Sequence, residues 1–324
     1  MVKRIDAFAH VLPRTFYDRM MEVHPTDELE ALGEVDYFWD LETRLSDMDE
    51  FGIDKQVLTI ARPPIWRGID PDDALEMTQV ANDAVREYSD QAADRFIAVG
   101  TLPRLDDEYL DEAKRIVEDL DMAGIQVFSN TEGEPIDSEA AEEIFAYAAE
   151  QGAPIWLHPQ LHEWHDWDDQ FMLHKMLGWP FDTSIAMCRL VYSGIMERHP
   201  DLAVIPHHMG AMIPHFQDRM QLFSEMLVEN RDVYPYPVPD FEEPPIEYFK
   251  NFYADTVRSG GTNVVEDGLE FYGDDHLLFA TDYPFGPENG RAFMREESRA
   301  VEEMDISESK RNRVWSENFK SLMG

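Results

Sequence analysis

The sequence predicts an α/β fold, namely a (β/α)8 TIM barrel with a small helical insertion after the first strand. Eight short runs rich in Val, Ile, Leu and Phe are spread along the 324 residues, and acidic segments with helical periodicity separate them. Because most runs are apolar throughout, we expect strands that are covered on both faces. A doubly wound open sheet is the alternative, but no Gly-rich phosphate-binding fingerprint follows any run.

The elements are assigned in chain order. The expected strands are residues 3–10, 55–61, 95–101, 124–129, 153–158, 202–207, 251–256 and 276–282. Helices such as "DALEMTQVANDAVREYSDQAADR" and "SEAAEEIFAYAAEQG" lie between them, and Gly152 ends the second of these. Residues 14–43 do not fit the repeat and are expected to form the helical insertion over the barrel mouth. The Pro-rich residues 233–249 are interpreted as a loop, and residues 1–324 as a single domain.

The composition restricts the partners of the protein. Asp and Glu number 67 against 27 Lys and Arg, which gives a formal net charge of −40. Such a charge repels phosphates, so neither nucleic acid nor an anionic membrane is an expected partner. An ordinary acidic enzyme is one interpretation, but the extreme excess favours adaptation to high salt, where screening removes the repulsion. The lone Cys188 and the absence of a membrane-length apolar run predict a cytoplasmic protein.

Polar residues recur at the ends of the predicted strands. His10, His158, the pair His207–His208, Asp255 and Asp282 end or follow the first, fifth, sixth, seventh and eighth runs. In a TIM barrel these ends meet on one rim, where active sites lie. Imidazole and carboxylate together are typical ligands of Zn²⁺ or a similar divalent ion.

Several motifs carry a resemblance to a known family. "IDAFAHVLP", "WDLETRLSDMDEFGI", "IWLHP", "HHMGAMIPHFQDRM" and "LLFATDYPFG" occur in this order along the chain. In this order and spacing the chain resembles the amidohydrolase superfamily, in particular the decarboxylase branch typified by aminocarboxymuconate-semialdehyde decarboxylase. The resemblance implies a metal-dependent, non-oxidative decarboxylase that acts on an aromatic or unsaturated carboxylic acid. It also implies a divalent metal, with Zn²⁺ expected before Mn²⁺.

The resemblance assigns roles to individual residues. His10, His158 and Asp282 match metal ligands, and Asp282 also matches a group that moves a proton. His208 matches the catalytic histidine. Arg44 falls where the branch places an arginine that binds the substrate carboxylate, and Arg219 falls where a second arginine crosses a dimer interface. A homodimer that binds a small anionic carboxylate is therefore expected.

The first strand departs from the family pattern at Phe8, where relatives have Glu or His. The strand period of two places Asp6, Phe8 and His10 on one face, so Phe8 should point toward the metal without binding it. We interpret its coordination position as one left to water or substrate. By the same alternation, His207 is expected to point away from His208.

Two other functions remain open from the sequence. A hydrolase or hydratase acting on a lactone, amide or unsaturated diacid would use the same metal to activate water. A barrel that has lost its metal and binds a small ligand is favoured by Phe8 alone. The histidines of the loop after the fifth predicted strand, His162, His165 and His174, are interpreted as residues near the mouth rather than as a second metal site.

Overall fold

The computed structural model describes residues 3–65, 68–160, 170–257 and 261–324. Each of the eight predicted runs contains a strand, and the third contains two. In chain order the strands are β1 (Ile5–His10), β2 (Lys55–Thr59), β3 (Phe96–Ala98), β4 (Gly100–Thr101), β5 (Ile125–Phe128), β8 (Ile155–His158), β9 (Val204–Pro206), β10 (Ala254–Asp255) and β11 (Leu277–Leu278). A short hairpin, β6 (Asn130–Thr131) with β7 (Glu134–Pro135), follows β5.

Backbone hydrogen bonds close these strands into a parallel barrel. The ladders run β1–β2–β3, β4–β5–β8–β9 and β10–β11. A bond from Tyr253 N to Val204 O, 2.9 Å long, connects the second ladder to the third. Ala7 N donates to Phe279 O over 2.8 Å, which connects the last strand to the first. The structure therefore confirms the predicted TIM barrel.

The barrel interior is filled by side chains rather than open. Trp156 from β8 is fully buried inside, and its indole Nε1 donates to Ala7 O over 2.8 Å. It packs with small and branched residues of the other strands, while Phe319 from the last helix, α15 (Asn318–Met323), joins the same cluster. This packing fixes the strand ends that carry the polar residues.

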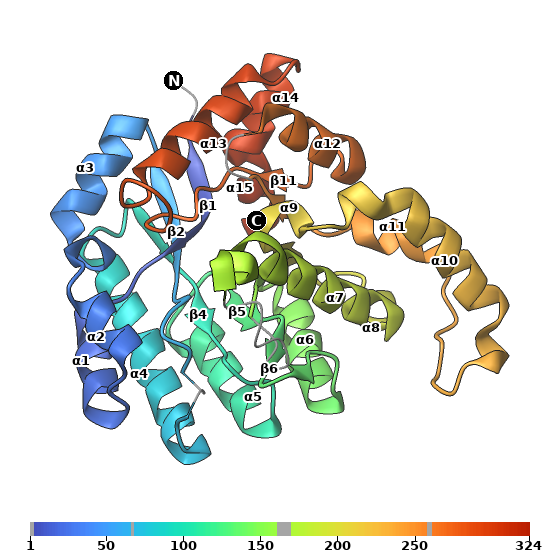
Figure 1. Ribbon diagram of the computed structural model, residues 1–324, viewed down its shortest axis with the longest axis horizontal. Coiled ribbons are helices and arrows are strands. Elements are labelled where there is room, and N and C mark those ends of the chain that lie inside the picture. Colours follow the sequence, from blue (N-terminus) through green and yellow to red (C-terminus); the bar gives the residue numbers. More distant parts are fainter. Residues whose placement is uncertain (1–2, 66–67, 161–169, 258–260) are drawn as a thin grey trace.

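Helices surround the strands (Figure 1). They include α3 (Leu41–Phe51), α4 (Pro71–Asp90), α5 (Asp107–Lys114), α6 (Glu139–Gln151), α7 (Trp179–Tyr192), α12 (Thr262–Tyr272) and α13 (Arg291–Glu303). Ser138 caps α6 by accepting a hydrogen bond from Ala141 N, and Gly152 ends the helix at a φ of 64°. A non-glycine residue disfavours this left-handed conformation, so the predicted end of α6 has a backbone cause.

The insertion after β1 is helical, as expected. It comprises α1 (Arg14–Val23), α2 (Asp27–Gly33) and the 3₁₀ turn η1 (Asp36–Phe38). Helix α1 packs against α4 beside the barrel, and the ring of Phe38 contacts that of Phe285 at 5.4 Å between centroids. The insertion thus reaches the barrel mouth through its last turn.

The segment after β9 departs furthest from the regular barrel. Helix α10 (Gln217–Glu229) extends away from it (Figure 1). The Pro-rich stretch that follows is not a loop throughout, because its end forms α11 (Pro245–Lys250). Pro245 occupies the first turn of α11, where a missing N–H costs no hydrogen bond, so the proline that suggested a loop instead begins a helix.

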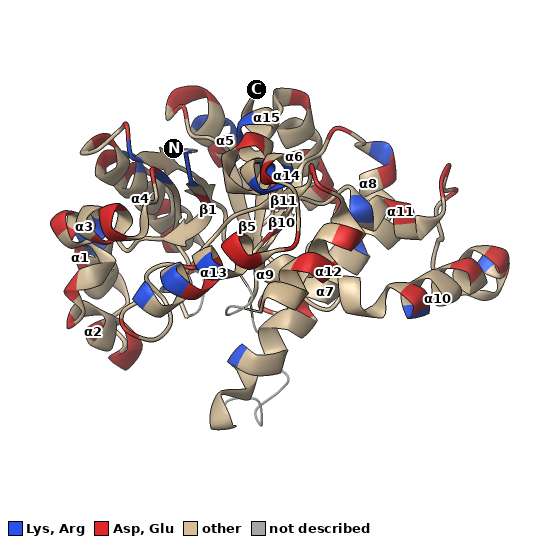
Figure 2. Ribbon diagram, turned by 90° about the horizontal axis from the view of Figure 1, so that it is seen from above, with Lys and Arg blue, Asp and Glu red and all other residues tan. Residues whose placement is uncertain are grey.

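Acidic residues are spread over the helices rather than collected in one patch (Figure 2). In the described part of the chain, no helix combines the length and the apolar character that crossing a membrane requires.

Candidate metal centre and active site

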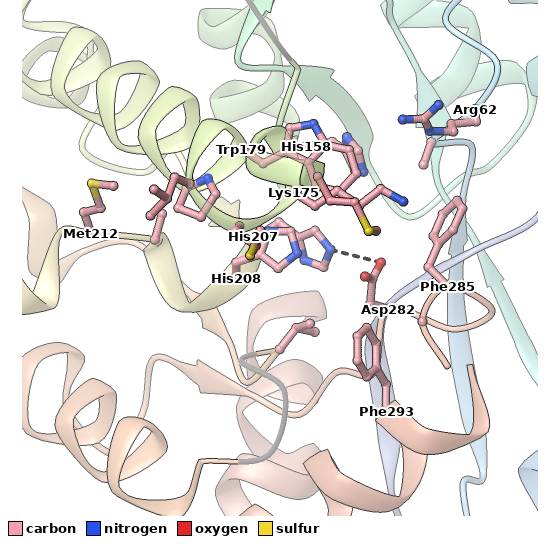
Figure 3. A pocket seen from close by; sticks show the side chains of 18 of the residues that line it. Arg62, His158, Lys175, Trp179, His207, His208, Met212, Asp282, Phe285 and Phe293 are labelled. Atoms are coloured by element: carbon pink, nitrogen blue, oxygen red, sulfur yellow. Dashed lines mark hydrogen bonds and ion pairs between the residues drawn. The ribbon is translucent and has the colours of Figure 1, made fainter. Parts of the chain in front are cut away.

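A cavity of about 810 Å³ opens at the carboxyl ends of the strands. Its polar lining includes His158, His207, His208 and Asp282, and the close-up shows these side chains near one another (Figure 3). Apolar residues make up much of the remaining wall, among them Met172, Met176, Leu177, Trp179, Phe285 and Phe293. Four of the polar residues at the predicted strand ends, His158, His207, His208 and Asp282, therefore line one cavity.

Hydrogen bonds set the tautomers of two histidines. His10 Nδ1 lies 2.8 Å from Thr59 Oγ1, and the Thr59 hydroxyl donates to the carbonyl of Ala9. His158 Nδ1 lies 2.8 Å from the carbonyl of Pro159, which can only accept. In both imidazoles Nδ1 therefore carries the hydrogen, and Nε2 presents a lone pair.

His207 is held in the same way by a carboxylate. Its Nδ1 donates to Asp255 Oδ2, and both side chains are buried. Asp255 Oδ1 accepts hydrogen bonds from Met209 N at 3.2 Å and Val257 N at 3.0 Å. Because both of its oxygens are engaged, Asp255 fixes the ring orientation of His207.

The Nε2 atoms converge on Asp282. Its Oδ1 lies 3.0 Å from His10 Nε2 and 3.3 Å from His207 Nε2. Ligand atoms of His10, His158 and His207 all lie within 4.8 Å of one another. His10 Nε2 is buried and has no hydrogen-bond partner among the described residues. Buried nitrogen lone pairs that face one another beside a carboxylate fit a divalent cation.

Burial and charge separate the protonation states of these groups. Burial lowers the pKa of His10, and burial together with the neighbouring histidines lowers the pKa of His158 well below its usual value. Burial also opposes the charged form of His207, but the Asp255 and Asp282 carboxylates outweigh it and raise the pKa of His207 to about 10. Against the effect of burial, the contacts with His10 and His207 hold the pKa of Asp282 below its usual range. Neutral His10 and His158 and an ionised Asp282 are the forms that bind a metal, whereas a cation bound by His207 would have to displace its proton.

The structure brings together His10, His158, Asp282 and His208. The expectation that His207 points away from His208 is wrong, because both line the cavity and their ring centroids lie 3.9 Å apart. Strand alternation stops at Pro206, and the chain turns at once into α9 (His207–Gly210), where His208 has a φ of 59° and a ψ of 52°. The sequence identifies Asp255 only as a strand-end residue. In the structure Asp255 accepts the hydrogen bond of His207 Nδ1 and so orients that ring.

Phe8 lies on the face that the strand period predicts. It is fully buried, and its ring centroid lies 4.1 Å from that of His207 and 5.5 Å from that of His10. The ring therefore occupies space beside the histidines without offering a ligand atom.

The two predicted carboxylate-binding arginines lie elsewhere. Arg44 is fully buried and donates to His10 O at 2.6 Å and to Gln56 Oε1 at 3.0 Å, and it is not among the described residues that line the cavity. This burial excludes a surface ion pair for Arg44. Arg219 lies exposed on α10, with its guanidinium carbon 4.8 Å from the centroid of the Phe223 ring.

Sequence reasoning missed two cations of the cavity wall, Arg62 and Lys175. Each charged group lies 5.9 Å from the centroid of the Trp179 ring. Arg62 directly follows the second predicted strand, so the strand-end rule could have found it, whereas no motif marks Lys175. Of the three loop histidines, His162 and His165 lie outside the described residues.

The chain is similar in sequence to proteins of known function. The chain is 27% identical over 260 residues to 2-amino-3-carboxymuconate-6-semialdehyde decarboxylase of Dictyostelium discoideum, covering 76% of this chain and 67% of that protein. It is 29% identical over 267 residues to gamma-resorcylate decarboxylase of Rhizobium radiobacter, covering 75% and 76%.

Solved structures show the same fold. The structure of 5-carboxyvanillate decarboxylase from Sphingomonas paucimobilis superposes with a TM-score of 0.86 at 21% identity, covering 100% of this chain and 99% of that one. A dihydroxybenzoic acid decarboxylase from Polaromonas, solved with bound manganese and an inhibitor, gives a TM-score of 0.80 at 23% identity, covering 100% and 97%. The sequence model of the amidohydrolase family matches residues 5–318. With nearly its whole length matched, the chain belongs to the amidohydrolase family.

Proposed function

We propose that this protein is a metal-dependent, non-oxidative decarboxylase, a carboxy-lyase that acts on an aromatic or unsaturated carboxylic acid. The observation that carries the proposal is the convergence of imidazole lone pairs and the Asp282 carboxylate at an apolar-walled cavity. The decarboxylase names of the relatives support it. The aromatic walls formed by Trp179, Phe285 and Phe293 suit a flat, unsaturated substrate.

His10, His158 and Asp282 would hold the divalent metal. Two imidazoles and one carboxylate are a common catalytic Zn²⁺ set, so we propose Zn²⁺, with Mn²⁺ as the alternative that the Polaromonas structure supports. When bound, the cation supplies positive charge that polarises a substrate oxygen and spreads the charge left by CO₂. The hydrogen bonds of Thr59 and Pro159 keep the two imidazoles turned toward it.

The remaining cavity residues bind the substrate and move a proton. As the bond to the carboxylate carbon breaks, its electron pair stays on the substrate carbon that CO₂ leaves. We propose that a protonated His208 donates to that carbon, so that a C–H bond replaces the C–C bond. Arg62 and Lys175 would attract and orient the anionic substrate in an otherwise acidic protein.

The proposed roles of Arg44 and Arg219 have different support. Arg44 holds the carbonyl of His10, which supports a positioning role; its direct contact with the substrate stays a prediction. Arg219 lies on a helix that exposes Leu222, Phe223 and Met226, each about half accessible. Exposed apolar side chains of this size mark association surfaces, which supports a homodimer in which Arg219 reaches the partner's cavity.

Two properties of the whole protein belong to the same proposal. The formal charge of −40, with only seven Lys, supports adaptation to high salt. The single cysteine supports a cytoplasmic location.

The test is CO₂ release from hydroxybenzoates and muconate semialdehydes, measured in high salt before and after chelation. We expect activity to disappear with chelator, to return with Zn²⁺ or Mn²⁺, and to fall at least about 100-fold in Asp282→Asn. Asp305→Asn, which changes an exposed carboxylate, is the matched control and should keep full activity. A product that retains the carboxylate carbon, or activity indifferent to both chelator and Asp282→Asn, would contradict the proposal.

A further inference from the structure

The resemblance to the amidohydrolase superfamily implies two metal ligands on the first strand, of which this chain offers one, His10. Phe8 takes the first position, and its carbon ring cannot coordinate a cation. Among the groups assigned by the sequence, two imidazoles and one carboxylate remain. The ring of Phe8 lies against His207, with 4.1 Å between centroids, so His207 approaches the centre on the side that Phe8 leaves without a ligand.

His207 has the burial and orientation of a ligand. Only 1% of its side chain is exposed. Its Nδ1 donates to Asp255, which two backbone N–H groups fix in turn, so Nε2 faces the centre. A carboxylate behind a histidine is the arrangement that commonly orients metal-bound imidazoles.

The distances around Asp282 agree with a shared cation. Bonds of about 2.1 Å to a tetrahedral ion place neighbouring ligand atoms about 3.4 Å apart. Asp282 Oδ1 lies 3.0 Å from His10 Nε2 and 3.3 Å from His207 Nε2. The ligand atoms of His10, His158 and His207 form one compact group, whereas His208 groups with His207 and Asp282.

We propose that His207 is the fourth protein ligand of the divalent cation and replaces the ligand that Phe8 cannot supply. The inference rests on the proposed function, because it concerns the same metal. It also gives two adjacent histidines different roles. His207 binds the cation, with Asp255 as its positioning residue, and His208 transfers the proton.

The first experiment counts ligands in the wild-type protein. X-ray absorption of the protein loaded with one equivalent of Zn²⁺ is expected to show three imidazoles and one carboxylate. Two imidazoles would overturn the inference while leaving the proposed decarboxylase intact. A protein that takes up no cation would overturn both.

The second experiment compares variants by the dissociation constant for Zn²⁺, measured against a competing chelator. His207→Ala is expected to weaken binding more than about 100-fold, and Asp255→Asn by about 10- to 100-fold. His208→Ala is the matched control and should bind Zn²⁺ within about twofold of the wild type. Unchanged affinity in His207→Ala would overturn the inference.

A rescue variant separates lost coordination from lost structure. In the double variant Phe8→His with His207→Ala, an imidazole returns to the first-strand position that faces the centre. Recovery of at least about tenfold in Zn²⁺ affinity over His207→Ala, with the absorption count back at three imidazoles, supports the exchange of ligand positions. No recovery in a double variant with wild-type circular dichroism would argue against it.

Discussion

Asp6 lies on the face of β1 that carries Phe8 and His10, one layer deeper in the barrel. Its Oδ1 accepts hydrogen bonds from Phe8 N and Thr281 N, and its Oδ2 accepts from Gln56 Nε2 and Thr281 Oγ1. Burial outweighs these four contacts and raises the pKa of Asp6 to about 7. The carboxyl is thus poised to titrate near neutral pH although it touches no solvent.

The raised pKa of Asp6 predicts a pH-dependent stability. The folded state binds the Asp6 proton more tightly than the unfolded state, whose pKa is about 4. The contribution of Asp6 to the free energy of unfolding is therefore fully present below about pH 4. It is lost as the pH rises through about 7, for a total of about 4 kcal/mol. Urea unfolding from pH 5 to 8 should show the free energy of unfolding falling with pH in the wild type.

The same titration in Asp6→Asn should lack this component. Asp305→Asn, in which an exposed carboxylate is removed, should keep the wild-type slope. Parallel curves for the wild type and Asp6→Asn would contradict the assignment to Asp6.

The candidate ligands differ in how far the sequence could predict them. His10, His158 and Asp282 end or closely follow strands, so the strand-end rule and the family motifs both found them. His207 could not be assigned, because alternation holds only within an extended strand and the chain leaves that conformation after Pro206. The contact that turns His207 inward comes from Asp255, on the next strand around the barrel, which no local pattern reveals.

The turn that presents His207 and His208 contains unusual backbone. His208, Met209, Gly210 and Ala211 all have φ between 56° and 65°. Ala211 combines a φ of 56° with a ψ of −112°, a conformation that favours glycine. Strain of this kind is common at functional sites and lowers the stability of the folded state.

Ala211→Gly is therefore expected to stabilise the protein by about 1 kcal/mol, because relief of strain exceeds the entropy cost of glycine. Urea unfolding at constant salt measures the change. Gly210→Ala is the opposing control and should lower the free energy of unfolding. Gly210 has a φ of 65°, and a Cβ there would lie 2.0 Å from Tyr272 Oη. A lower free energy of unfolding in Ala211→Gly would refute the strain argument.

Element positions were predictable where packing follows a simple period. All eight predicted runs contain strands because a barrel strand is apolar on both faces, and Gly152 marks the end of α6 correctly. Helix α11 was missed because Pro245 was interpreted as a loop signal, although proline also begins helices. The hydrophobic pattern of the sequence does not indicate that α10 extends away from the barrel.

Helix α10 carries the prediction about assembly. Phe223→Asp places a charge among exposed apolar side chains and is expected to shift the proposed homodimer toward monomer by at least about tenfold in dissociation constant. Sedimentation velocity in high salt measures the shift. Phe223→Leu, which keeps an apolar side chain, should remain dimeric. A wild-type protein that is monomeric at micromolar concentration would contradict the dimer.

The acidic surface determines how the whole molecule should respond to salt. Asp and Glu lie on helices all around the barrel (Figure 2), so their repulsion acts on the folded state as a whole. Screening shortens the range of this repulsion from about 10 Å at 0.1 M salt to about 3 Å at 1 M. The melting temperature should therefore rise between 0.1 and 2 M potassium chloride. Sorbitol at equal osmolality is the control, and an equal rise in sorbitol would argue against charge screening.

The hydrogen bonds that close the barrel also join the two ends of the chain. Asp282 N donates to Phe8 O, so the proposed ligands His10 and Asp282 lie on either side of the closing seam. A cation bound by both would cross-link the first and last strands and so close a very long loop of the chain. During synthesis this cross-link can form only after the final strand has emerged and docked. Tight metal uptake would then report that the barrel is complete, and loss of the metal would loosen both ends of the chain together.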